Sequence, residues 1–169
     1  MLFEAIFKEL DRRRIRYLVI GGIAVNLHGF ARATGDLDIM LWLEEENLEK
    51  FVDMVKFLRM KPRAPVPLES FLDPQQRSKW IKEKGMKVFT VYNPKKEIEH
   101  IDVLLEKYIS FERAYKNREV ISAGGIKISL LSIPDLIKLK KIAGRERDKI
   151  DIQALKQIME IKNEKKKIS

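Results

Sequence analysis

The segment VIGGIAVNLHGFARATGDLDIML, residues Val19 to Leu41, decides the predicted fold. An apolar strand ends at the pair Gly21-Gly22, a short helical stretch follows, and Asp36 and Asp38 then stand in a second apolar run. Side chains alternate along a strand, so both aspartates point to one face, about 6 to 7 Å apart. Two carboxylates on one face repel each other unless a cation or a proton lies between them. The pattern predicts an acidic site at the edge of a sheet.

A third carboxylate, Asp102, has a similar setting in the segment HIDVLL, residues 100–105. Alternate residues of this predicted strand are apolar and can face a core, which leaves His100 and Asp102 on the other face. If the two strands are neighbours, Asp102 lies close to Asp36 and Asp38. Three carboxylates make a hard-oxygen site suited to Mg²⁺ or Mn²⁺, and two such ions can bind the attacking and leaving oxygens of a phosphoryl transfer. Taken alone, Asp102 is also consistent with a strand-end cap or a solvated residue.

The glycine pair follows a strand and precedes a helix, so its bare backbone N–H groups can approach a phosphate closely. It matches neither G-x-G-x-x-G nor G-x-x-x-x-G-K-[ST], so the sequence supports neither a Rossmann fingerprint nor a P-loop. A tight turn without a ligand is the simpler interpretation of Gly21 and Gly22.

Hydrophobic periodicity predicts the remaining elements. The expected helices are Leu2–Arg14, Ile23–Gly29, Glu44–Leu58, Gln75–Gly85, Pro134–Gly144 and Arg147–Ile161. The expected strands are Tyr17–Ile20, Asp36–Leu43, an antiparallel pair formed by Met86–Tyr92 and His100–Leu105, and a hairpin over Glu119–Leu131. The proline-rich stretch Lys61–Pro74 is expected to be an extended surface loop. The sum is an α/β (α+β) domain with a small mixed sheet.

Length and composition indicate a single domain. At 169 residues and 45% apolar content, the chain can build one core and is too short for two. We expect one domain over 1–169, with a C-terminal helical part at about 134–163 and a frayed tail at 164–169. There are no cysteines, which excludes disulfides and thiolate metal sites. Because no stretch reaches the roughly 20 apolar residues that cross a bilayer, we expect a cytoplasmic protein with no membrane partner.

The net charge of +9 favours anionic partners such as nucleotides or RNA. Part of the excess lies in the runs RRRIR, residues 12–16, and KNEKKKIS, residues 162–169. These runs are consistent with a solvated helix end and a frayed tail, or with a nucleic-acid surface.

The order of the glycine pair, the Asp-Leu-Asp run at 36–38 and Asp102 resembles the signature of the DNA polymerase beta-like nucleotidyltransferase superfamily, whose third carboxylate lies on a later strand. The finer stretch HGFARATGDLDIML resembles the small bacterial and archaeal nucleotidyltransferases related to aminoglycoside and lincosamide adenylyltransferases and to abortive-infection toxin enzymes. In that group an Arg-x-Thr precedes the Asp-x-Asp, and Arg32 and Thr34 match it here.

The stretch LIKLKKIAGRERDKIDIQAL, residues 136–155, is similar to a second segment of the same group, a Lys followed by Gly-Arg and an Asp-x-x-Asp. The matching residues are Lys140, Gly144, Arg145, Asp148 and Asp151. The likeness covers most of the chain in order, with residues 61–85 unmatched.

The resemblance implies a nucleotidyltransferase fold and transfer of a nucleoside monophosphate from a nucleoside triphosphate, with ATP as the expected donor, to an acceptor hydroxyl, releasing pyrophosphate. Asp36 and Asp38 would hold two Mg²⁺ or Mn²⁺ ions, and Asp102 would hold the one that activates the acceptor and accept the acceptor's proton. The implied nucleotide-binding residues are Gly21, Gly22, Arg32, Thr34, Lys140 and Arg145, whose cations would face the triphosphate.

The cations have simpler interpretations. Arg32 is also consistent with a solvated loop residue, and Lys140 with the solvated face of a lysine-rich helix. Asp148 and Asp151 are consistent with ion pairs, to Arg145 or Lys149, that hold the last two helices together. The two histidines, at 28 and 100, are expected to be structural or exposed, since neither has a second histidine at metal-ligand spacing.

Two functions stay open from the sequence. The first is an active metal-dependent nucleotidyltransferase, whose acceptor hydroxyl belongs to a small molecule, a protein or RNA. The second is a non-catalytic nucleotide- or RNA-binding component of a toxin-antitoxin or defence pair, favoured by the basic charge. A homodimer or a cognate partner protein is compatible with either. Residues that choose the acceptor are expected in the Lys61–Pro74 loop and the C-terminal helices.

Overall fold

Seven strands form one mixed sheet in the order β3-β4-β5-β2-β1-β7-β6, in a computed structural model that describes residues 1–169. The strands are β1 Tyr17–Ile20, β2 Leu37–Leu41, β3 Lys61–Pro62, β4 Val88–Asn93, β5 Lys96–Leu104, β6 Glu119–Ala123 and β7 Ile126–Leu130. The contacts of β2 with β5 and of β1 with β7 are parallel, and the other pairs are antiparallel. The mixed sheet predicted from the sequence is confirmed.

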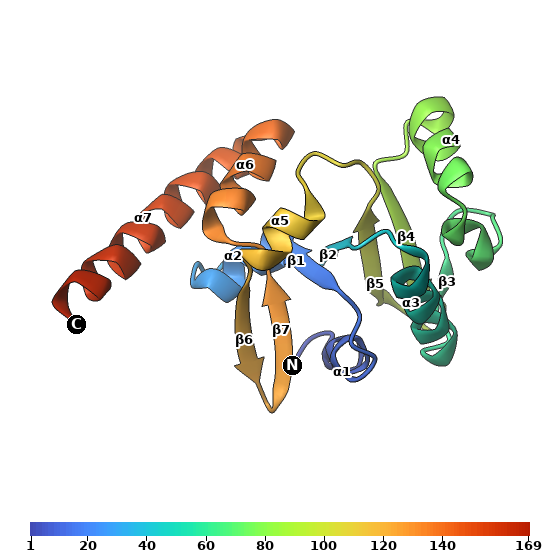
Figure 1. The fold of residues 1–169 in the computed structure, drawn as a ribbon, viewed down its shortest axis with the longest axis horizontal. Coiled ribbons are helices and arrows are strands. Elements are labelled where there is room, and N and C mark those ends of the chain that lie inside the picture. The colour runs from blue at the N-terminus through green and yellow to red at the C-terminus, as the bar shows by residue number, and fades with distance from the viewer.

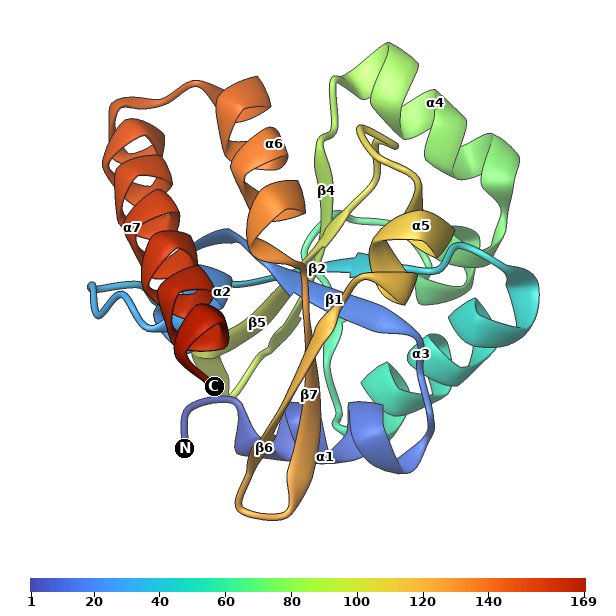
Figure 2. The same cartoon turned by 60° about the vertical axis from the view of Figure 1, so that its left-hand side comes forward.

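Helices surround this sheet (Figure 1). They are α1 Glu4–Arg12, α2 Gly21–His28, α3 Glu45–Phe57, the 3-10 helix η1 Leu68–Leu72, α4 Pro74–Lys84, α5 Phe111–Lys116, α6 Ile133–Ala143 and α7 Glu146–Ile168. In both views α6 and α7 lie at one end of the molecule and α4 lies at the other (Figures 1 and 2). No helix combines the length and the apolar character that crossing a bilayer requires.

Alternation along the central strands places the core on one face of β2, β4 and β5. The buried side chains on that face are Leu37, Ile39, Phe89, Val91, Ile101 and Val103. Their neighbours in the chain, including Asp38, Thr90 and Asp102, therefore point to the opposite face. Because a slip of one residue would turn the carboxylates into the core, this apolar set fixes the register that forms the site.

The stretch Lys61–Pro74 differs from its expected form as an extended surface loop. It contains the short edge strand β3 and the helix η1, and Leu68 and Phe71 are buried. The ring of Phe71 stacks on Phe89 with centroids 4.7 Å apart and also packs against Phe51. Aromatic packing between distant parts of the chain orders this stretch, which local proline content does not reveal.

Three helix assignments also differ. α2 begins at Gly21, so the glycine pair forms its first turn rather than preceding it. α5 was not expected; the side chain of Ser110 caps it by accepting a hydrogen bond from the backbone N–H of Arg113. α7 runs to Ile168, past the predicted end at Ile161 and through most of the tail expected to fray. The predicted stop of α6 is confirmed, since Gly144 adopts the left-handed conformation there.

Candidate active site

The turn from β1 into α2 brings the glycine pair against the first acidic strand. Ile20, the last residue of β1, lies opposite Asp38 in the antiparallel register with β2. Gly21 has a φ of +67°, a conformation that favours glycine, and a Cβ there would overlap Asp38 Oδ2. A Cβ on Gly22 would lie 2.7 Å from Thr34 Oγ1 and 2.8 Å from Arg32 Nη2. Both glycines are therefore needed for close packing around the carboxylate.

The second and third acidic positions are brought together by the parallel pairing of β2 with β5. Asp38 and Asp102 are direct neighbours in this register, so the condition that the strands be adjacent is met. Asp36 precedes β2 and is exposed; its Oδ1 lies 3.0 Å from His100 Nε2. Thr90 Oγ1 donates a 2.6 Å hydrogen bond to Asp102 Oδ1 from β4. All three carboxylates line one cavity.

The ionised form of Asp38 is destabilised by its surroundings. Burial raises its pKa to about 7, and the negative charges of Asp102 and Asp36 add to the effect. Arg145 and His100 oppose it only in part. A carboxyl group with this pKa is about half protonated at neutral pH, and a nearby cation would return it to the ionised form.

The cavity has a volume of about 500 Å³ and opens between the sheet and the C-terminal helices. All of the predicted nucleotide-binding residues line it. Two further cations, Lys87 before β4 and Arg147 in α7, line it as well and were not predicted. The cavity is therefore lined by three carboxylates of the acidic strands, by Asp148 of α7 and by five cations.

The cations at 32, 140 and 145 belong to one ion-pair network around the buried carboxylates Asp148 and Asp151. Lys140 Nζ lies 2.8 Å from Asp151 and 3.3 Å from Asp148, and only 4% of Lys140 is exposed. Arg32 pairs with Asp151 at 3.0 Å, and Arg145 pairs with Asp148 at 2.9 Å. Burial alone would raise the pKa of Asp148, but the hydrogen bonds from Arg145 and the charge of Lys140 hold it below its ordinary value. Two carboxylates face three cations, so the network keeps one positive charge.

This network changes the interpretation of its members. The suggestion that Lys140 lies on a solvated helix face is wrong, because the residue is buried. The suggestion that Asp148 and Asp151 form structural ion pairs is correct. Asp151 also pairs with Arg32, which lies outside the last two helices, in the loop before β2. The network therefore fixes the C-terminal helices to the loop that carries Arg32 and Thr34.

The donor set fits a divalent cation in its chemistry. Three carboxylates share one cavity wall, Asp38 is destabilised in its ionised form, and three cavity cations are already paired with other acids. In the arrangement observed, no three His, Cys, Asp or Glu side chains are grouped as ligands of a metal ion. Asp36 is turned to His100 and Asp102 to Thr90. Binding a metal would require rotation of these two carboxylates toward Asp38.

Sequence reasoning missed several side chains of the site. Thr90, Lys87 and Arg147 were not predicted, because the sheet register and the packing of α7 bring them to the site. His100 lies beside Asp36, on the carboxylate face where its alternation with Asp102 placed it. His28 is structural, as expected: it is buried, and its Nε2 lies 2.7 Å from the carbonyl oxygen of Leu131.

Comparison with solved structures supports the fold. An antigenic nucleotidyltransferase-like protein from Paracoccidioides brasiliensis aligns over 92% of this chain and 72% of its own, with a TM-score of 0.55 and 15% identity. ANT(2")-Ia, solved in complex with adenylyl-2"-tobramycin, aligns over 91% of this chain and 85% of its own, with a TM-score of 0.56 and 12% identity. At these identities the likeness shows the nucleotidyltransferase fold alone.

Sequence comparison identifies the family. No functionally curated protein matches the chain. The family described as "Nucleotidyltransferase of unknown function (DUF6036)" matches residues 1–167, nearly the whole length. The resemblance seen in the glycine pair and the acidic strand is thereby confirmed, and the chain belongs to this family of nucleotidyltransferases.

Proposed function

We propose that this protein is a metal-dependent nucleotidyltransferase that moves a nucleoside monophosphate from a nucleoside triphosphate, with ATP as the donor, to an acceptor hydroxyl. The observation that carries the proposal is the pairing of Asp38 with Asp102 on adjacent parallel strands, directly beside Gly21. The family match and the five cations that line the same cavity support it. Binding alone would not need three carboxylates on one wall of an anion-binding cavity.

The chain's own groups are placed to bind a triphosphate. The first turn of α2 presents the N–H groups of Gly21 and Gly22, and a helix N-terminus attracts phosphate. Arg145, Lys87 and Arg147 are exposed at the cavity and can contact phosphate oxygens directly. Lys140 is buried and lines the same cavity as Arg145, so it adds positive charge there.

Asp36, Asp38 and Asp102 would hold Mg²⁺ or Mn²⁺, with two ions when nucleotide is bound. Such ions stabilise negative charge on the attacking and leaving oxygens of a phosphoryl transfer. Thr90 holds one Asp102 oxygen in the metal-free arrangement, and an Asp102 oxygen that is not bound to a metal could accept the proton of the acceptor hydroxyl. The acceptor oxygen then forms a bond to the α-phosphorus, the bond from that phosphorus to the bridging oxygen breaks, and pyrophosphate leaves with the electron pair.

A transfer assay tests the proposal. Purified protein is incubated with α-labelled ATP, Mg²⁺ and fractionated cell extract, and the label is expected to pass to one acceptor fraction. Asp38→Asn is expected to abolish transfer, while Asp53→Asn, a matched change at an exposed site on α3, leaves it unchanged. If no triphosphate binds at millimolar concentration with metal present, the proposal is lost. A non-catalytic binding component would bind nucleotide in the same experiment but transfer nothing.

A further inference from the structure

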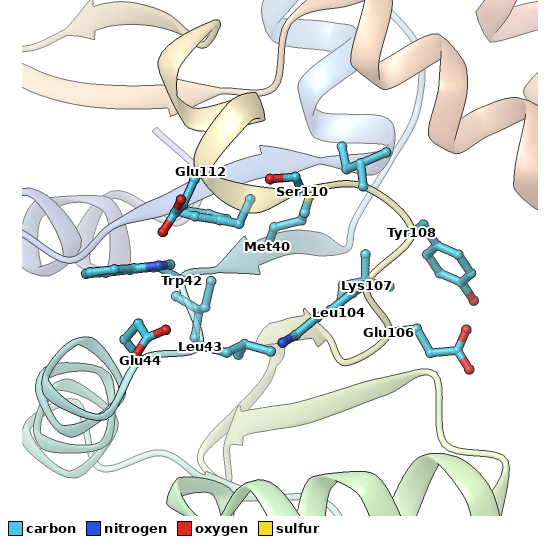
Figure 3. Close-up of a pocket in the computed structure, with 13 residues that line it drawn as sticks. Met40, Trp42, Leu43, Glu44, Leu104, Glu106, Lys107, Tyr108, Ser110 and Glu112 are labelled. Atoms are coloured by element: carbon cyan, nitrogen blue, oxygen red, sulfur yellow. The ribbon is translucent and has the colours of Figure 1, made fainter.

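A second cavity, of about 420 Å³, lies along the sheet from the first. It is bounded by the ends of β2 and β5 and by the segment at 106–112 that leads into α5 (Figure 3). Its lining is mostly apolar and includes Met40, Trp42, Leu104 and Phe111. A cavity of this volume and lining is typical of a binding site for a small organic molecule.

The two cavities are continuous along one face of the sheet. Met40 follows Asp38 by two residues on β2, and Leu104 follows Asp102 by two residues on β5. Each apolar side chain therefore shares a face with a carboxylate, about 6 to 7 Å further along its strand. Leu104 and Tyr108 line both cavities. In Figure 3 Tyr108 stands at one end of the second cavity and Trp42 at the other.

The charges of the two cavities are opposite in kind. The first is lined by five cations, Arg32, Lys87, Lys140, Arg145 and Arg147, and by four aspartates, Asp36, Asp38, Asp102 and Asp148. The second cavity has Lys107 as its one basic residue, against the acids Glu44, Glu106 and Glu112. The charged side chains therefore give the first lining a net charge of +1 and the second a net charge of −2, so a triphosphate is favoured in the first cavity over the second. A polynucleotide acceptor would bring its phosphates against the same glutamates, and like charges in contact are unfavourable.

We propose that the second cavity is the acceptor subsite and that the acceptor is a small, largely apolar molecule that carries a hydroxyl group and no negative charge. This assignment rests on the proposed nucleotidyl transfer. A molecule seated between Trp42 and Leu104 can present its hydroxyl past Tyr108 to Asp102. The bonds made and broken, and the proton transfer to Asp102, are those given above, with the nucleoside triphosphate as co-reactant.

Binding is tested first without nucleotide, using the full chain and ¹H–¹⁵N NMR. Three probes of similar size differ in charge: tyramine is a cation, tyrosol is neutral and 4-hydroxyphenylacetate is an anion. Tyramine and tyrosol are expected to shift the amide signals of residues 40–44 and 104–112. The anion is expected to bind about tenfold more weakly than tyramine, which corresponds to the repulsion of a few partly screened charges.

Charge reversal at the rim gives the matched variant. The double substitution Glu106→Lys and Glu112→Lys is expected to weaken tyramine binding about tenfold and to strengthen binding of the anion. The control is Glu83→Lys with Glu160→Lys, which makes the same change in net charge at exposed positions on α4 and α7. The control is expected to keep the preference of the original protein, and the dispersion of each spectrum shows that the variant is folded.

Three results would overturn the assignment: no probe shifts residues 104–112 at millimolar concentration, the anion binds as tightly as tyramine, or rim and control variants behave alike. In the transfer assay, tyrosol should compete with the acceptor and not with ATP, and competition with ATP would also overturn it. Nucleotide binding is followed separately through the amides of Gly22 and Arg32 when ATP and Mg²⁺ are added. Failure there counts against the proposed function and leaves the test of the second cavity intact.

Discussion

Replacing Asp38 by asparagine should stabilise the metal-free protein at alkaline pH while removing activity. The folded state raises the pKa of Asp38 from 3.8 to about 7, chiefly by burial. A folded pKa above the unfolded value means that the native state binds the proton more tightly. The ionised carboxylate therefore opposes folding above that pKa, and this cost vanishes as the pH falls below the unfolded value.

The size of the effect follows from the two pKa values. At about 1.4 kcal/mol per pH unit, the cost is about 4 kcal/mol near pH 8 and about 1 kcal/mol near pH 4.5. For a domain of this size, each kcal/mol changes the melting temperature by about 2 to 4 °C. Asparagine has nearly the same shape and no charge, so Asp38→Asn should melt about 10 °C higher than the original protein near pH 8.

The measurement is thermal unfolding followed by circular dichroism, in a chelator, across this pH range. The melting temperatures of the two proteins should converge as the pH falls. Asp53→Asn, at an exposed carboxylate on α3, is the control and should shift the melting temperature by little at any pH. Equal stability of Asp38→Asn and the original protein near pH 8, or an advantage that does not shrink on acidification, would refute the reasoning.

Three further outcomes are expected. Mg²⁺ or Mn²⁺ should raise the melting temperature of the original protein and not that of Asp38→Asn; an equal rise in both would place the metal elsewhere. Gly21→Ala should lose nucleotide transfer and about 1 to 2 kcal/mol of stability, because alanine is strained at this left-handed φ and its Cβ would overlap Asp38. Gly85→Ala is the control: Gly85 has a similar φ and no atom near the position of a new Cβ, so this variant should lose stability and keep transfer. If both glycine variants transfer equally, the close contact is unimportant. Asp151→Asn removes the buried carboxylate shared by Lys140, which is buried, and Arg32, which is partly buried, and should cost about 3 to 5 kcal/mol in urea unfolding; a loss below about 1 kcal/mol would contradict the network.

Local patterns predicted the elements that position the carboxylates. The alternation of apolar and acidic residues in β2 and β5 was readable because each strand buries one face, and the parallel register then made neighbours of Asp38 and Asp102. Gly144 gave the end of α6 because its left-handed conformation is a local property. These features depend on a few consecutive residues, so the sequence contains them directly.

Features that depend on contacts between distant residues were not predictable. η1 is ordered by Phe71 packing between Phe51 and Phe89, which lie far apart in the chain. The burial of Lys140 depends on the crossing of α6 with α7, which brings Asp148 and Asp151 to it. Acceptor-choosing residues were expected in the Lys61–Pro74 loop and the C-terminal helices, and neither lines the second cavity, which arises where β2, β5 and the segment before α5 converge.

The ion-pair network gives the cavity a helix-side wall that does not depend on a ligand for its charge balance. Asp151 joins Arg32, at the entrance to β2, to Lys140 on α6, and Asp148 joins Lys140 to Arg145 at the cavity. Each buried charge has a partner, so the wall needs no rearrangement to present its net positive charge to a triphosphate. The sheet-side wall is the opposite case: Asp38 is raised in pKa, and Asp36 and Asp102 are turned to neighbouring side chains. Cation binding should therefore reorganise the carboxylates and leave the helices in place, which amide spectra of β2 and α7 recorded with Mg²⁺ would separate.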